Sequence, residues 1–223
     1  MATPPPFALD PLPYRTPAAW AEAQRPHVDE LLLEQAHLEK KAAAGALSLS
    51  FRLPAQLGRQ RALSALAREE LVHFERTLRL LERRGLAFAP QASSGYAERL
   101  KRAIGRDLPQ RLVDELLVAS IIEARSHERM DLLARALRDT EPEVADFYAE
   151  LCEAEARHES LYAELAASVL PPDAVAARHK QLGIYEAEQL RTLPFAPRLH
   201  SGAPAAVAER DGSDGVRSER AFG

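Results

Sequence analysis

Two copies of a short motif carry the side chains of a metal site. Residues Glu70 to His73 and Glu155 to His158 both read Glu-x-x-His, and this spacing places a carboxylate and an imidazole one turn apart on one face of a helix. One such motif from each of two helices, with a single glutamate from each of two others, is the ligand set of helical-bundle centres that hold two iron or manganese ions. The predicted ligands are Glu39, Glu70, His73, Glu123, Glu155 and His158.

Each glutamate in this set interrupts an apolar stripe near the middle of a predicted helix. Glu123, for example, shares a face with Leu116, Ala119, Met130 and Leu133. An ionised carboxylate buried without a partner costs several kcal/mol, whereas the net stability of a whole domain is roughly 5–15 kcal/mol. Two divalent cations would neutralise four such carboxylates, and the histidines would add neutral nitrogen ligands.

Other polar residues lie near this predicted centre without matching its pattern. A third Glu-x-x-His, formed by Glu34 and His37, falls off the stripe through Glu39, so its side chains are predicted at the surface or behind the ligands. His127, four residues after Glu123, has the same interpretation. Tyr162 lies one turn from His158 and is predicted to line the pocket, although a plain core tyrosine explains it equally well.

The apolar periodicity predicts the helices that position these residues. Long helices are expected over about 28–50, 55–84, 107–138 and 140–169, with a shorter fifth helix over 173–192. The first and second helices are joined by a short link, as are the third and fourth. More than twenty residues, including a short helix over 96–104, separate the two pairs. This connectivity predicts an all-α, ferritin-like four-helix bundle with one long crossover plus a short extra helix.

The ends of the chain differ from its middle in composition. Residues 1–27 are rich in proline and are predicted to form an extended N-terminal arm, followed by the ferritin-like domain over 28–193. Residues 194–223 are rich in Gly, Ala, Pro, Ser and charge, and this C-terminal tail is expected to be partly disordered.

Composition narrows the class of protein. The formal charge of −4 does not indicate a protein that binds polyanions through its overall charge, although a local basic patch could still bind phosphates. No apolar run reaches the roughly 20 residues of a membrane span, no signal-peptide pattern is seen, and Cys152 is the single cysteine. A cytoplasmic location without membrane association is therefore expected. The lone cysteine also excludes the Cys-x-x-Cys iron site of a rubrerythrin-type peroxidase.

Several stretches resemble the bacterial tRNA 2-methylthio-N6-isopentenyladenosine hydroxylase family. They are residues 37–43 (HLEKKAA), 66–74 (LAREELVHF), 123–129 (EARSHER) and 155–158 (EARH), and the resemblance extends over about 28–200 and to the His200-Ser-Gly202 segment. It implies a ferritin-like fold and a non-haem di-iron centre on the same six ligands. It also implies that dioxygen is used to hydroxylate the isopentenyl group of the adenosine 3′ of the anticodon.

The resemblance further implies two kinds of partner. Two external electrons per turnover call for a reductase or a ferredoxin, because the chain has no Gly-x-Gly-x-x-Gly for a flavin or nicotinamide. Phosphates of tRNA would be held by basic residues outside the pocket, although an ordinary solvated face explains any one of them. The candidates are Lys40, Lys41, Arg99, Lys101, Arg102 and Arg106. A monomer and a dimer are both compatible with the sequence.

Other dimetal proteins remain alternatives. A manganese catalase uses a similar ligand set, and a ferroxidase shares the fold, although paired Glu-x-x-His motifs disfavour iron storage. A helical interaction domain without catalysis would leave four core glutamates unexplained.

Overall fold

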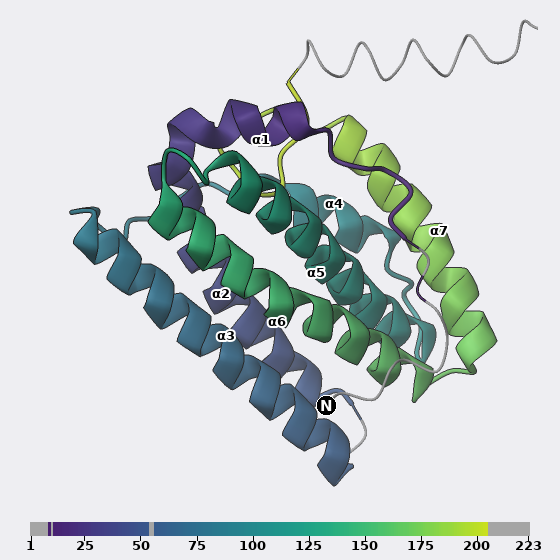
Figure 1. Cartoon of the computed structure of the whole chain (residues 1–223). Helices are drawn as coiled ribbons and strands as arrows, with labels where there is room; N and C mark the ends of the chain where they lie inside the picture. The colour runs from purple at the N-terminus through teal and green to yellow at the C-terminus, as the bar shows by residue number, and fades with distance from the viewer. Residues whose placement is uncertain (1–8, 10, 54–55, 205–223) are drawn as a thin grey trace, which may run out of the picture.

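Four long helices form the bundle (Figure 1). The computed structural model describes residue 9 and residues 11–53 and 56–204. Helices α2 (Val28–Ser50) and α3 (Leu57–Arg83) pack together as one hairpin, and α5 (Gln110–Ala136) and α6 (Pro142–Ala167) pack as the other. No strand occurs in these described ranges, so the predicted all-α class and the two-hairpin arrangement are confirmed.

The two hairpins are joined by the predicted crossover. Helix α3 ends at Arg83 and is followed by Gly85, whose φ of 71° is the left-handed conformation that favours glycine. The Leu86 N–H donates back to the Leu81 carbonyl. The crossover then holds α4 (Tyr96–Leu100) and a 3₁₀ turn, η2 (Lys101–Ala103). The last helix, α7 (Pro172–Arg191), packs against α4, α5 and α6.

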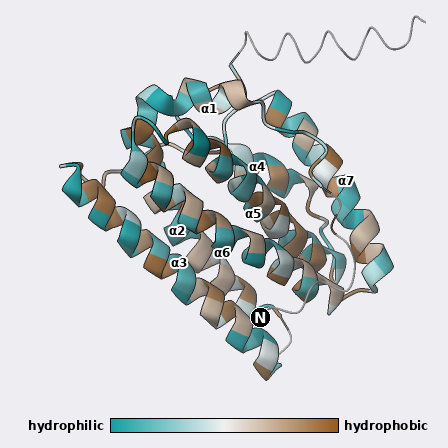
Figure 2. Cartoon of the chain, in the orientation of Figure 1, coloured by the Kyte–Doolittle hydropathy of each residue, from teal (hydrophilic) through white to brown (hydrophobic). Residues whose placement is uncertain are grey.

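The apolar core consists of two clusters separated by a polar layer. Along α3, Leu66 belongs to one cluster and Leu80 to the other, and Glu70 and His73 lie between them. In the other three long helices the predicted ligands also lie between residues of the two clusters. Burial of each leucine contributes about 1.5–3 kcal/mol, so the two clusters hold the helices in register around the layer. Figure 2 shows the resulting alternation of polar and apolar residues along the bundle helices.

Both ends of the described chain are more ordered than the sequence indicated. Within the predicted extended arm, α1 (Ala18–Gln24) and the 3₁₀ turn η1 (Arg25–His27) are helical, because the fully buried Trp20 anchors this segment against α5. Residues 199–201 of the predicted tail are also buried. Residues 205–223, where disorder was expected, lie outside the described residues. Among the described residues, no helix combines the length and apolar character needed to cross a membrane.

Candidate metal centre

Two clusters of buried ligand atoms meet at Glu70 in the polar layer. Glu39, Glu70 and His73 form the first, and Glu70, Glu123 and His158 form the second. Within each cluster, one atom from every residue lies within 4.8 Å of the others. These five residues come from all four long helices. One carboxylate is therefore shared by two groups that could each hold a metal ion.

The imidazoles of both Glu-x-x-His motifs turn the same ring nitrogen towards Glu70. Nδ1 of His158 lies 2.7 Å from Oε1 of Glu70, and Nδ1 of His73 lies 3.9 Å from Oε2 of Glu70. Nδ1 of His73 is also 3.7 Å from Oε2 of Glu39. The two rings are 6.4 Å apart between centres, which leaves Glu70 between them.

The sixth predicted ligand, Glu155, lies beside the second cluster. Its side chain is buried and hydrogen-bonds the carboxyl of Glu123. Burial, reinforced by the neighbouring charge of Glu123, raises the pKa of Glu155 well above its ordinary value. A carboxyl in this position favours the neutral form unless a cation is near.

Four buried polar atoms in this layer make no well-aligned hydrogen bond, although those of Glu70 and His158 lie close together as an ion pair. They are Oε1 of Glu70, Nδ1 of His73, Oε2 of Glu155 and Nδ1 of His158. Such atoms are rare in folded proteins because each one costs about 1–3 kcal/mol. Their chemistry, carboxylate oxygen and imidazole nitrogen, is the donor set of iron, manganese and zinc. The residues present therefore fit a pair of such cations.

The protonation states of the metal-free centre reflect its crowded charges. Burial alone would lower the pKa values of His73 and His158. The neighbouring carboxylates outweigh burial, Glu39 and Glu70 for His73 and chiefly Glu70 for His158, and raise both values to about 9. Burial raises the pKa of Glu39 to about 8. For Glu70, the two histidines beside it overcome burial and lower the pKa. Metal binding would have to displace these protons.

Two neighbours that the sequence interpretation missed orient the centre. Nε2 of Gln35 donates to Oε1 of Glu39 at 2.6 Å, and Oε2 of Glu69 lies 3.1 Å from Nε2 of His158. Arg157 in turn pairs with Glu69. Gln35 was detectable in principle, because it precedes Glu39 by one helical turn. The contact of Glu69 joins residues that are 89 positions apart, which no local pattern reveals.

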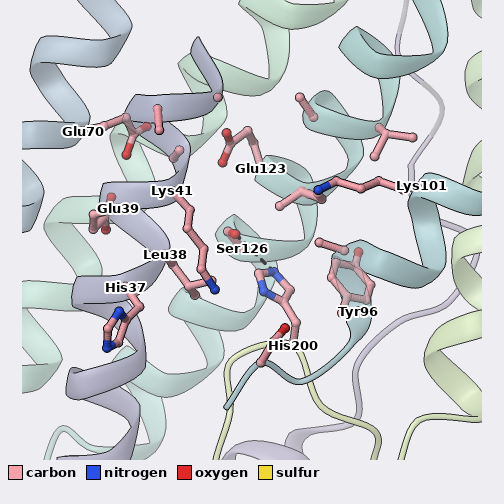
Figure 3. A pocket seen from close by; sticks show the side chains of 18 of the residues that line it. His37, Leu38, Glu39, Lys41, Glu70, Tyr96, Lys101, Glu123, Ser126 and His200 are labelled. Atoms are coloured by element: carbon pink, nitrogen blue, oxygen red, sulfur yellow. Dashed lines mark hydrogen bonds between the residues drawn. The ribbon is translucent and has the colours of Figure 1, made fainter. Parts of the chain in front are cut away.

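A cavity of about 690 Å³ opens onto the centre. Glu39, Glu70, Glu123 and Glu155 line it, together with apolar side chains that include Ile122, Met130 and Tyr162. Figure 3 shows the carboxylates of Glu70 and Glu123 on one side of this space and His200 on another. Tyr162 is among the residues that line this cavity, and its side chain is also buried.

The other residues predicted near the centre have separate positions. Glu34 is buried and lines the cavity, and its carboxylate accepts the Leu199 N–H. Burial raises its pKa to about 7. His37 also lines the cavity, and its Nε2 lies 2.8 Å from the Ala89 carbonyl. His127 is partly buried and is not among the residues that line the cavity.

Two of the six predicted basic residues line the cavity, and the other four do not. Lys41 and Lys101 are exposed and line the cavity. Lys40 instead places its ammonium 4.8 Å from the ring centre of Phe88, and Arg99 donates to Thr192 Oγ1 at 2.7 Å. The remaining two, Arg102 and Arg106, are exposed and do not line the cavity.

The sequence matches a family model over most of its length. Residues 7–201 match the family described as tRNA-(MS[2]IO[6]A)-hydroxylase (MiaE). The chain belongs to this family. Among its relatives is the tRNA 2-(methylsulfanyl)-N(6)-isopentenyladenosine(37) hydroxylase of Pseudomonas putida, which is 38% identical over 193 residues, or 86% of this chain and 93% of that one. The hydroxylase of the same name from Salmonella typhimurium is 34% identical over 141 residues, or 63% of this chain and 51% of that protein.

A solved structure shares the fold of this MiaE family member. It is described as Protein 43 with aldehyde deformylating oxygenase activity from Synechococcus. The two chains superpose with a TM-score of 0.82 at 39% sequence identity, and the match covers 87% of this chain and 98% of the other. The ferritin-like fold predicted from the helix connectivity is thereby confirmed.

Proposed function

We propose that this chain hydroxylates the isopentenyl group of (2-methylthio)-isopentenyladenosine next to the anticodon of tRNA, with a di-iron centre, dioxygen and external electrons. The observation that carries this proposal is the pair of ligand clusters sharing Glu70 at the wall of a cavity, in a chain of the MiaE family. Two relatives named as tRNA hydroxylases of this nucleoside support the substrate. A tRNA substrate also implies that the protein works in the cytoplasm.

The six acidic and imidazole side chains have distinct proposed roles. Glu39 and His73 would hold one ion, Glu123 and His158 the other, and Glu70 both. Glu155 would complete the set next to Glu123. When bound, two iron ions supply the redox chemistry by which dioxygen gives one oxygen atom to a C–H bond and the other to water, at the expense of two electrons and two protons. Nothing else in the chain has to be redox-active.

The protein's own side chains would bind and orient the substrate. Ile122, Met130 and Tyr162 line the cavity and offer an apolar surface to the prenyl group, which excludes water from the reacting carbon. Lys41 and Lys101 line the same cavity and are exposed, so they can contact tRNA phosphates while the modified base enters. The electrons would come from a separate reductase or ferredoxin.

A second candidate is oxidation of an aldehyde. The Synechococcus protein named for aldehyde deformylating oxygenase activity is as similar in sequence to this chain as the Pseudomonas hydroxylase is. The exposed lysines lining the cavity favour a polyanionic substrate over an aldehyde. A manganese catalase or a ferroxidase would use the same ligands without an organic substrate.

Nucleoside mass spectrometry of tRNA tests the proposal in cells. A strain without the gene should accumulate prenylated adenosine and lose its hydroxylated form, and the wild-type gene should restore it, whereas a Glu70→Gln copy should not. Hydroxylated nucleoside at an unchanged level in the deletion strain would refute the proposal. Iron-loaded protein should convert prenylated tRNA and leave an aldehyde and peroxide unchanged. Conversion of the aldehyde alone would favour the second candidate.

A further inference from the structure

One side chain of the C-terminal segment reaches the cavity. His200 follows α7 and lines the cavity together with the four glutamates, whereas its neighbours Leu199 and Ser201 do not line it. All three residues are buried. His200 was not among the residues that the metal-site pattern selected, and no role in the proposed metal centre requires it.

Buried polar contacts fix the backbone on both sides of His200. The Leu199 N–H donates to Glu34, and the Leu199 carbonyl accepts from Nη1 of Arg129. On the other side, Oγ of Ser201 accepts from Nε1 of Trp20 and Nε2 of Gln24, each at 3.2 Å. Buried hydrogen bonds of this kind are costly to leave incomplete. The segment is therefore held in a single position from both ends.

A close backbone approach adds to this restraint. A Cβ atom built on Gly202 would lie 1.7 Å from the carbonyl oxygen of Leu193, and the Gly202 N–H donates to the Pro194 carbonyl at 3.0 Å. Only glycine allows the chain to close here. The turn that presents His200 thus depends on Gly202.

The imidazole ring of His200 makes contacts on one face and at one edge. Its ring stacks on Tyr96 with 4.6 Å between centres and 1° between planes, and its Nε2 lies 3.3 Å from Oγ of Ser126. The hydroxyl of Tyr96 donates to Glu186 at 2.9 Å, which fixes the stacking partner too. In Figure 3, the side of the ring away from Tyr96 faces the space towards Lys41.

The ring is also uncharged, and it lies close to the proposed centre. Burial, with the positive charges of Arg129 and Arg125, lowers the pKa of His200 well below its ordinary value. Its partner Ser126 follows Glu123 by three residues on α5, which is about 4.5 Å along a helix axis. A neutral aromatic ring therefore contacts the residue that lies about one helical turn from a predicted metal ligand.

We propose that His200 is a substrate-positioning residue whose open face stacks on the purine ring of the modified adenosine. This inference rests on the proposed function, and it states which protein group recognises the base. A base that leaves the anticodon stack loses its stacking neighbours, and an aromatic side chain can replace them in a sequence-tolerant way that contributes to binding. With the purine on His200, the prenyl amine can point along α5 towards Glu123.

Three substitutions separate stacking from a structural role. His200→Phe keeps an aromatic face and loses the contact with Ser126, whereas His200→Gln keeps a polar edge and loses the face. His200→Ala loses both. His127→Gln changes a histidine outside the cavity and is the matched control. Binding of isopentenyladenosine nucleoside is measured by equilibrium dialysis, and KM and kcat are measured with a prenylated anticodon stem-loop.

Stacking predicts that His200→Gln and His200→Ala raise both Kd and KM by on the order of 10- to 100-fold. The value of kcat at saturation should fall less, while His200→Phe and His127→Gln should stay within a few-fold of wild type. The metal content and the melting temperature of the variants should not change in parallel with Kd and KM. If His200→Ala does not fold, the comparison of His200→Phe with His200→Gln still distinguishes stacking from a structural role.

Two results would overturn the proposal. A wild-type KM in His200→Gln together with a raised KM in His200→Phe would show that the hydrogen bond to Ser126, and not stacking, determines KM. Unchanged KM and Kd in all three variants would show that the ring does not touch the substrate. A wild-type protein that hydroxylates no prenylated stem-loop would instead refute the proposed function, and the role of His200 with it.

Discussion

Oε1 of Glu70 lies 2.7 Å from Nδ1 of His158, so the carboxylate of one Glu-x-x-His motif contacts the imidazole of the other. The second oxygen of the same carboxylate faces His73. Helices α3 and α6 are thus connected in the polar layer through one side chain. Any change at Glu70 alters both ligand clusters, whereas a change at Glu39 or Glu123 alters one.

Replacing Glu70 should therefore abolish most metal binding. We expect two divalent ions per wild-type chain and less than half of that content in Glu70→Gln, because the substitution removes the shared negative charge from both clusters. Elemental analysis of purified protein reloaded with ferrous iron measures the content. Glu75→Gln, which changes an exposed glutamate of the same helix, should bind two ions as the wild type does. A Glu70→Gln protein that retains both ions would contradict the shared role.

Glu155→Gln should stabilise the metal-free protein while weakening metal binding. Because burial beside Glu123 raises the pKa of Glu155 well above its ordinary value, folding near neutral pH requires this carboxyl to take up a proton that the unfolded chain has released. Glutamine removes that cost, so we expect the free energy of unfolding in chelator to rise. Urea denaturation measures it.

Added metal should reverse the order of stability of the wild type and Glu155→Gln. Ferrous or manganous ion should raise the melting temperature of the wild type more than that of Glu155→Gln, because a ligand that binds only the folded state stabilises it. Equal stabilisation of both proteins by metal would show that Glu155 makes no contact with either ion.

The pattern that located this layer is local, and that is why the sequence revealed it. A glutamate at a core position of a helix breaks an apolar stripe within a few residues, so Glu39, Glu70, Glu123 and Glu155 were identifiable before any contact was known. The same periodicity predicted the first helix at 28–50 and the second at 55–84, and the structure has Val28–Ser50 and Leu57–Arg83.

Features that depend on distant contacts were not predictable in this way. His200 meets Ser126 across 74 positions and stacks on Tyr96 from the crossover, and neither contact leaves a periodic signal. Helix α1 was missed because prolines dominate its surroundings, whereas the burial of Trp20 against α5 decides its structure. Tertiary packing outweighs local composition at both ends of the described chain.

A pH dependence of stability should follow from Glu34. Its pKa is about 7 in the folded protein because it is buried, against an ordinary value of 4.5. Between these values the unfolded chain loses the proton and the folded chain keeps it, so the stabilising effect of this proton is complete below 4.5 and is lost as the pH rises to about 7. The full difference corresponds to about 3 kcal/mol.

Glu34→Gln should remove this dependence and keep an acceptor for the Leu199 N–H. The variant should be more stable than wild type by up to about 3 kcal/mol near pH 8, and by much less near pH 5. Urea titrations of both proteins in chelator at the two pH values give the difference. A gain that is the same at both pH values would show that Glu34 does not titrate with folding.

The lysines that line the cavity should control the salt dependence of tRNA binding. Lys41→Ala and Lys101→Ala should each weaken binding several-fold at low salt and reduce the slope of log K against log salt by about 1, because one phosphate contact is lost. Filter binding over a range of salt concentrations measures the slope. Arg79→Ala, on α3 and outside the cavity, is the control. Slopes unchanged in both lysine variants would place the phosphates elsewhere.

Oxygen transfer from dioxygen to the prenyl group is the most direct test of the central claim. Iron-loaded protein is incubated with prenylated tRNA, a reductant and isotopically labelled dioxygen. The tRNA is then digested, and the masses of its nucleosides are measured by mass spectrometry. We predict that the hydroxylated prenyladenosine gains one labelled oxygen atom, and that Glu70→Gln produces none. An unmodified prenyladenosine from fully iron-loaded wild-type protein, or a hydroxyl group without the label, would contradict the account.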